Sequence, residues 1–109
     1  MVVHGIPGPY ELAEGDLLSI DVGVTLDGYV ADSATTVAVG QAPEQALELI
    51  GVCEQSLLAA IAQCRAGNRL GDISHAVQEV VEAEGFGVVR ALVGHGVGRD
   101  MHEDPQIPN

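Results

Sequence analysis

The sequence contains no lysine, so its only basic residues are four arginines, which stand against 16 acidic residues. The formal net charge at pH 7 is −12. Binding to phosphates or to anionic lipid requires clustered basic side chains, and the four arginines are spread over residues 65–99. The charge therefore argues against nucleic acid and membrane surfaces as partners.

Cysteine is also scarce, with two residues in the whole chain, Cys53 and Cys64. Both fall in one expected helix, where a rise of about 1.5 Å per residue separates them by roughly 16 Å. They cannot form a disulfide with each other at that distance. Without a disulfide framework there is no sign of an oxidising compartment, and we interpret both as buried apolar thiols rather than as metal ligands or nucleophiles.

Long hydrophobic runs are absent too. No stretch approaches the roughly 20 unbroken apolar residues of a membrane span. The N-terminal sequence MVVHGIPGPYE lacks a basic segment leading into an apolar run, which a secretory signal would require. We therefore expect a cytoplasmic location.

The composition that remains is that of a folded protein. Hydrophobic residues make up 47% and charged residues 18% of the 109 positions, which suits one globular domain. The first strand is expected to begin at once with Val2 and Val3, and the sequence stops at Asn109 without a terminating element. We therefore expect residues 1–109 to form a single, partial domain.

A β-hairpin is expected over residues 17–39, because β-branched residues flank Asp27-Gly28, a dipeptide suited to a type I′ turn. Apolar positions at helical spacing predict one helix over 43–65 that ends before Gly67. A second helix is expected to begin at Asp72 as its N-cap and to end at Gly85.

Residues 86–93 are expected to form a strand, and residues 94–109 a loop or short-strand region. The order of elements predicts an α/β fold of the α+β type, with antiparallel pairing and both helices on one face of the sheet.

With a turn at residues 27–28, Asp21 faces Ala34 and Asp32 faces Gly23 across the hairpin. The two aspartates then become diagonal neighbours on one face, close enough to share a metal ion or to bridge two. Small residues surround them and leave a hollow. Spacing alone leaves open the alternative that both aspartates lie on an ordinary solvent-exposed face of the hairpin.

Three of the four histidines lie in glycine-rich or acid-rich segments: His4 in HGIP, His95 in GHGVG and His102 in HEDP. Glycines let a substrate or a metal approach an imidazole closely. His75 lies within the second expected helix, where we interpret it as a packing residue. The nearby acids Glu79, Glu82 and Glu84 suit a solvated helix face.

These segments resemble type I methionine aminopeptidases over essentially the whole chain. The resemblance rests on HGIP at His4, SIDVGVTLDGYVAD ending at Asp32, GHGVGRDMHEDP from Gly94, and QIPN at the end. It implies the "pita-bread" α/β fold and removal of N-terminal methionine from nascent polypeptides. It also implies a site with two divalent metal ions, for which Co, Mn, Fe or Zn would suit carboxylate and imidazole ligands.

The resemblance implies a role for each matched residue. Asp21 would be a bidentate metal ligand, Asp32 would bridge both ions, and His95 would bind one ion through a ring nitrogen. His102 would contact the scissile amide of a substrate with an N-terminal methionine. His4 would line the site and assist catalysis.

The family's other two metal ligands are glutamates beyond the last residue of this sequence, and Glu103 does not occupy a metal position. We therefore expect a partial catalytic domain without the N-terminal extension and the C-terminal part of the family domain, and impaired activity. The alternative is a catalytically incomplete half-fold that binds metal or a partner, or self-associates through exposed strand edges.

Overall fold

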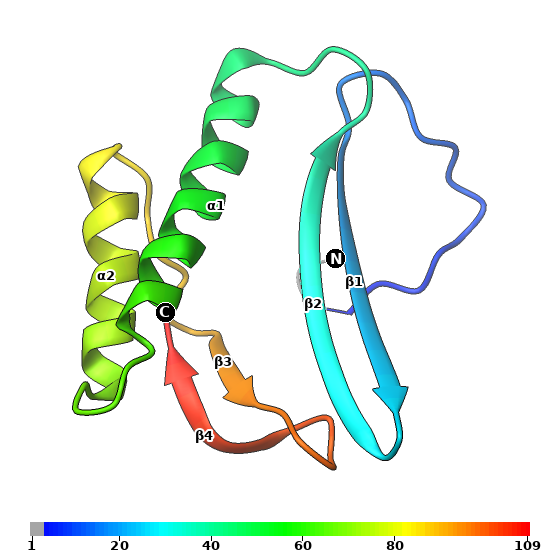
Figure 1. Ribbon diagram of the computed structural model, residues 1–109. Coiled ribbons are helices and arrows are strands. Elements are labelled where there is room, and N and C mark those ends of the chain that lie inside the picture. Colours follow the sequence, from blue (N-terminus) through cyan, green and yellow to red (C-terminus); the bar gives the residue numbers. More distant parts are fainter. Residues whose placement is uncertain (1–3) are drawn as a thin grey trace.

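The computed structural model describes residues 4–109 and contains two helices and two small antiparallel sheets (Figure 1). The first sheet pairs β1 (Leu17–Leu26) with β2 (Tyr29–Ala38), and the second pairs β3 (Val93–Gly96) with β4 (Glu103–Pro108). Between them in the chain come the helices α1 (Glu44–Gln63) and α2 (Leu70–Ala83). The predicted α/β class with antiparallel pairing is confirmed.

The first hairpin turns at Asp27 and Gly28, whose φ angles of 51° and 79° are those that a type I′ turn needs at both central positions. This turn fixes the register, because a slip of one residue would move every side chain to the other face. Asp21 pairs with Ala34 and Asp32 pairs with Gly23, as predicted.

Helix α2 ends as predicted, with Gly85 directly after its C-cap at a φ angle of 77°. Helix α1 ends at Gln63, before Gly67, whose φ angle is 99°. The start of α2 differs from the prediction, because the helix begins at Leu70 and Asp72 is its third residue rather than its N-cap. From there the Asp72 carboxylate accepts a hydrogen bond from the Arg69 N–H at 2.7 Å. An acidic side chain can satisfy the helix start from this inner position as well as from the cap.

Helix α1 lies between the first hairpin and α2, so the two helices do not both cover one face of that sheet (Figure 1). The buried side chains lie on the helices: Val52, Ser56 and Ala60 of α1, and Val81 of α2. The predicted apolar stripe of α1 through Cys53 and Cys64 is therefore not its buried side. Both cysteines are exposed, so their interpretation as buried thiols is wrong.

Residues 86–92 form no strand, contrary to the prediction of one over 86–93. Their N-terminal part instead closes α2, since the N–H groups of Gly85 and Phe86 donate to the carbonyl oxygens of Glu82 and Val81. Backbone donors used in this way are not available to a sheet. The strand predicted at Val2 and Val3 lies outside the described residues.

The apolar face of the first hairpin, opposite the two aspartates, is largely exposed, with Val22 at 47%, Val24 at 53% and Leu26 at 73%. The chain is correspondingly open. Its radius of gyration is 15.5 Å, where a compact chain of this length would have about 13 Å. Its accessible surface is 8319 Å², where a compact monomer of this mass would expose about 5,700 Å².

Among residues 4–109, α1 is long and apolar enough to cross a membrane by length and composition, although polar residues interrupt its apolar sequence. The helix carries Glu44, Glu48 and Glu54. Core helices of soluble proteins meet the same criteria, so the finding alone does not assign α1 to a membrane.

Candidate metal centre

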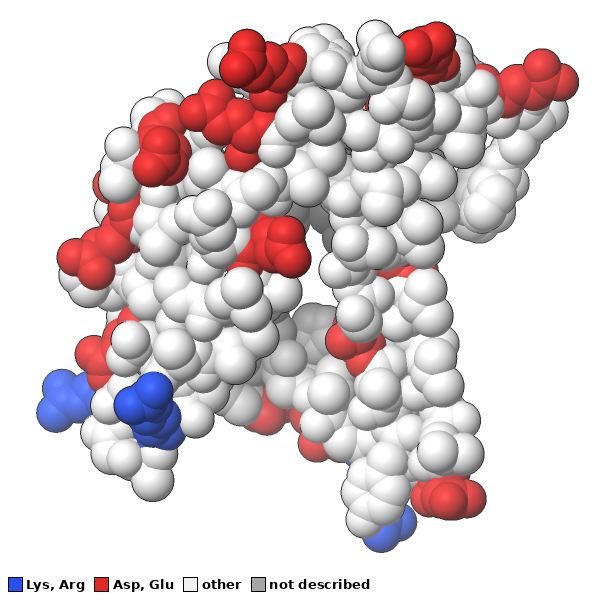
Figure 2. All heavy atoms as spheres, turned by 45° about the horizontal axis from the view of Figure 1, so that its top comes forward, with Lys and Arg blue, Asp and Glu red and all other residues white. Residues whose placement is uncertain are grey.

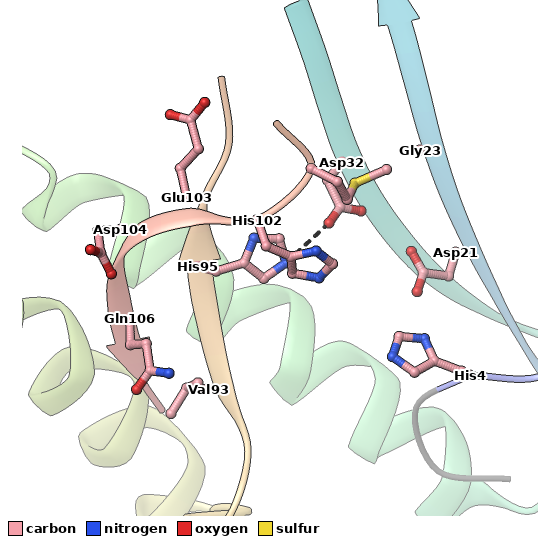
Figure 3. Close-up of a pocket in the computed structure, with 11 residues that line it drawn as sticks. His4, Asp21, Gly23, Asp32, Val93, His95, His102, Glu103, Asp104 and Gln106 are labelled. Carbon is pink, nitrogen blue, oxygen red and sulfur yellow. Dashed lines mark ion pairs between the residues drawn. The ribbon is translucent and has the colours of Figure 1, made fainter. Parts of the chain in front are cut away.

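Asp21 of β1 and Asp32 of β2 lie on the same face of the first hairpin, as the observed register requires. Both line a cavity of about 750 Å³ between this hairpin and the second one (Figure 3). The same cavity is lined by His4, His95 and His102. The structure thus places all five residues singled out in the sequence around one hollow.

The tightest pairing in the cavity joins the two hairpins. The His95 Nε2 atom lies 3.3 Å from the Asp32 Oδ2 atom, and the two side chains are 24% and 28% exposed. The other ring nitrogen of His95, Nδ1, lies 3.0 Å from the carbonyl oxygen of Gly96. A carbonyl oxygen can only accept, so this contact is a hydrogen bond when Nδ1 carries a hydrogen, and Nε2 is the nitrogen directed at the carboxylate.

His102 stacks beside His95, with ring centroids 4.2 Å apart and planes tilted by 41°. His95 lies on β3, whereas His102 immediately precedes β4. The second hairpin therefore supplies the imidazoles of His95 and His102, and the first supplies the carboxylate of Asp32.

Asp21 and His4 line the cavity without joining the Asp32–His95 pair. Within residues 4–109, no three His, Cys, Asp or Glu side chains lie close enough together to hold a metal ion. The structure thus pairs His95 with Asp32 and, separately, with His102, whereas Asp21 and His4 line the same cavity.

The residues between the His4 segment and β1 are bonded to one another and to the end of the first hairpin. Gly15 N–H donates to the Val39 carbonyl oxygen at 2.8 Å. Asp16 Oδ2 accepts hydrogen bonds from the Ala13 N–H and from the Tyr10 hydroxyl, each at 2.9 Å. The Ala13 N–H and then the Tyr10 hydroxyl hold the pKa of the Asp16 carboxyl below its usual value. The hydrogen bond from the Tyr10 hydroxyl to Asp16, together with the Asp16 charge, raises the pKa of Tyr10.

The charge around the cavity favours cations. Four acidic residues are among those that line it, Asp21, Asp32, Glu103 and Asp104, and no arginine is. Figure 2 shows acidic side chains spread over the face seen there and basic ones only at its margins. A cavity with walls of one sign attracts ions of the other.

The donors suit a divalent metal ion. Carboxylate oxygens and imidazole nitrogens are common ligands of first-row transition metals. Histidines that bind a metal through one nitrogen usually donate the other N–H to a carbonyl or carboxylate. His95 has this arrangement, with Nδ1 bonded to Gly96 and Nε2 facing Asp32.

Met101 is a lining residue that the sequence analysis did not single out. A Cβ atom added to Gly23 would overlap the Met101 methyl group, so the absence of a side chain at Gly23 lets Met101 lie across β1. The position of Met101 directly before His102 was the available signal. The sequence pattern places Glu103 outside the metal ligands and gives no signal for its contacts with the loop before it.

Comparisons with known proteins agree with this geometry. The profile of metallopeptidase family M24 matches residues 1–109. The chain is 52% identical over 108 residues to a methionine aminopeptidase of Clostridium perfringens, covering 99% of this chain and 43% of that protein. It therefore spans less than half the length of this relative.

Solved structures show the same fold. A methionine aminopeptidase from Rickettsia prowazekii superposes with a TM-score of 0.94 at 40% identity, over 97% of this chain and 43% of that one. A prolidase from Pyrococcus furiosus superposes with a TM-score of 0.87 at 27% identity, over 98% of this chain and 32% of that one. The chain belongs to metallopeptidase family M24, a family of enzymes that use divalent metal ions.

Proposed function

We propose that this chain forms part of a metal-dependent aminopeptidase that removes N-terminal methionine from nascent polypeptides. The observation that carries the proposal is the cavity in which Asp32 and His95 meet beside Asp21 and His102. The 52% identity to a methionine aminopeptidase supports this substrate class over the proline-specific relatives, whose similarity is lower. A cytoplasmic location is part of the same proposal.

In this proposal Asp21, Asp32 and His95 would hold the metal ions, with Asp32 as a ligand shared by both ions and Asp21 as a ligand of one. His95 contributes Nε2, the nitrogen already directed at Asp32. Two divalent ions of Co, Mn, Fe or Zn would acidify a bound water and polarise the scissile carbonyl.

The other two histidines act on the substrate in this proposal. The side chain of His102, stacked on His95, contacts the scissile amide and stabilises the oxygen on which charge develops. His4 enters from the opposite wall of the cavity and assists catalysis (Figure 3). Met101, which lies over Gly23, adds an apolar surface near these groups.

On its own, the 109-residue chain should bind metal weakly and turn over little substrate. It offers three of the five ligands that the resemblance to methionine aminopeptidases implies, and loss of ligands lowers affinity. Glu103 is not counted among these ligands, because its carboxylate is bonded to its own loop. We therefore propose that residues 1–109 form a partial catalytic domain.

A chimera tests the proposal directly. The 108 matched residues of the Clostridium perfringens enzyme would be replaced by this chain, and methionine release from a Met-Ala-Ser peptide measured with Mn(II) and Co(II). The chimera should cleave the peptide, Asp32→Ala should abolish cleavage, and Glu48→Ala on α1 should leave it unchanged. A folded chimera in which Asp32→Ala retains full turnover would refute the proposed role.

A second candidate function rests on the open shape of the chain. It exposes about 2,600 Å² more surface than a compact monomer of its mass would. Within residues 4–109, each strand pairs on one side only, which leaves strand edges available. We infer that the isolated chain self-associates, with a second copy covering the apolar face of the first hairpin.

A further inference from the structure

The loop between β3 and β4 carries the residues that reach across to the first hairpin. It begins after His95 and Gly96 and ends at His102 and Glu103. The regular register of this hairpin breaks between His95 and Gly96, where Gly96 becomes the partner of Glu103. The position of His102 against His95 therefore depends on the shape of the loop.

Glu103 bonds to the backbone of this loop. One carboxylate oxygen, Oε1, accepts the Arg99 N–H at 2.7 Å and the Asp100 N–H at 3.0 Å. Hydrogen bonds to an ionised acceptor are about twice as strong as neutral ones. The side chain is partly buried and, in Figure 3, points away from the aspartates and the imidazoles. Its carboxylate thus serves the loop, and the metal site lies elsewhere.

Gly98 makes this contact possible. A Cβ atom at this position would lie 2.5 Å from Glu103 Oε2 and 2.7 Å from Oε1, closer than real Cβ atoms approach. The φ angle of Gly98 is not in the left-handed region, so backbone conformation does not require glycine here. The Glu103 carboxylate occupies the space that a Cβ atom would need, so a side chain at position 98 would force the carboxylate to move.

The loop held by Glu103 is docked on the first hairpin. The Gly98 carbonyl oxygen accepts the Val30 N–H at 2.7 Å, which joins the loop to β2. The Arg99 guanidinium lies 5.3 Å from the centre of the Tyr29 ring. Met101 then lies over Gly23 on β1. Glu103 thus shapes a loop that contacts both strands carrying the aspartates.

We propose that Glu103 is a positioning residue, which braces the 98–102 loop so that His102 stays stacked on His95 and Met101 stays over Gly23. The inference that this brace supports metal binding rests on the proposed function of the aspartate–histidine centre. The geometric role of Glu103 is independent of any metal.

Four variants of the 109-residue chain test the brace. Glu103→Ala removes the acceptor, and Glu103→Gln retains Oε1 and both backbone bonds. Gly98→Ala inserts a Cβ into the carboxylate. The double variant Gly98→Ala/Glu103→Ala removes that overlap. Gly98→Ala should therefore disturb the loop when Glu103 is present, and it should have little further effect when position 103 is already alanine.

The direct readout is the nuclear Overhauser effect between protons of neighbouring side chains, which requires neither metal nor activity. Met101 is one of only two methionines, so its methyl signal is easily assigned. Native chain and Glu103→Gln should show cross-peaks from this methyl to Gly23 and between the His95 and His102 rings. In Glu103→Ala and Gly98→Ala both cross-peaks should disappear while circular dichroism stays unchanged. Persistence of both cross-peaks in Glu103→Ala would overturn the proposal.

Calorimetry with Mn(II) tests the link to the metal site. Loss of a residue that orients metal ligands typically weakens binding by about 10- to 100-fold, which we expect for Glu103→Ala and not for Glu103→Gln. If Glu103→Ala binds Mn(II) as tightly as native chain although its cross-peaks have disappeared, the link is overturned. If native chain binds no Mn(II), the proposed function of this chain fails, and the cross-peaks still decide the brace.

Discussion

Val22→Glu on the apolar face of β1 should weaken self-association of the isolated chain by at least about 100-fold, because a desolvated charge in an interface costs several kcal/mol. The side chain is 47% exposed in the single chain. Each copy has about 2,600 Å² of excess surface. If association buries about half of it on each copy, the total buried area falls in the range of obligate dimers, roughly 2,000–5,000 Å². In a two-fold dimer the new charge would enter that interface twice.

Sedimentation equilibrium over a range of concentrations gives the dissociation constant. Thr25→Glu is the matched control, since it adds the same charge to the same strand on the opposite face. It should leave association unchanged. The reasoning is refuted if native chain is a folded monomer at all concentrations, or if Val22→Glu associates as tightly as native chain does.

Three other predictions follow from particular contacts. Gly96→Ala should destabilise the chain by roughly 1–3 kcal/mol in urea unfolding, because its Cβ would lie 2.6 Å from the Asp104 carbonyl oxygen, whereas Gly94→Ala, at 3.5 Å from the nearest atom, should cost less. Equal costs would contradict this account. Val81→Ala should cost roughly 1–2 kcal/mol by loss of buried methyl groups, while the exposed Val89→Ala should change stability by less than about 0.5 kcal/mol. Tyr10→Phe should move the pKa of Asp16 up towards its usual value of 3.8, as followed by carboxyl carbon shifts. Because the folded pKa is lowered, the stability that Asp16 contributes is present above pH 3.8 and is lost as pH falls through the folded pKa, so Tyr10→Phe should reduce this acid-dependent loss.

The hairpin and its diagonal aspartates could be predicted because one local signal, Asp27-Gly28, fixes the turn and therefore the whole register. The grouping of His95 with Asp32 follows from motif resemblance rather than from spacing, since the two residues lie on different sheets. The roles assigned to the five site residues stay predictions.

The failures of prediction concern tertiary packing. The helical spacing predicts that Cys53 and Cys64 are buried, but the buried side chains of α1 are Val52, Ser56 and Ala60, and both cysteines are exposed. Hydrophobic pattern cannot say which side of a helix finds a partner when several sides are apolar. The strand predicted at 86–93 is also absent over most of that range, because the N–H group of Phe86 bonds to the Val81 carbonyl oxygen at the end of α2 instead of to a neighbouring strand.

The most direct test of the central claim is calorimetric titration of Mn(II) and Co(II) into metal-free chain, with Asp21→Ala and Asp32→Ala measured beside it and Glu48→Ala as the control. The account predicts weak binding that both aspartate substitutions abolish and Glu48→Ala leaves intact, with little cleavage of a Met-Ala-Ser peptide. Binding unaffected by either aspartate substitution, or no binding at all, would contradict the assignment of this cavity as a metal site.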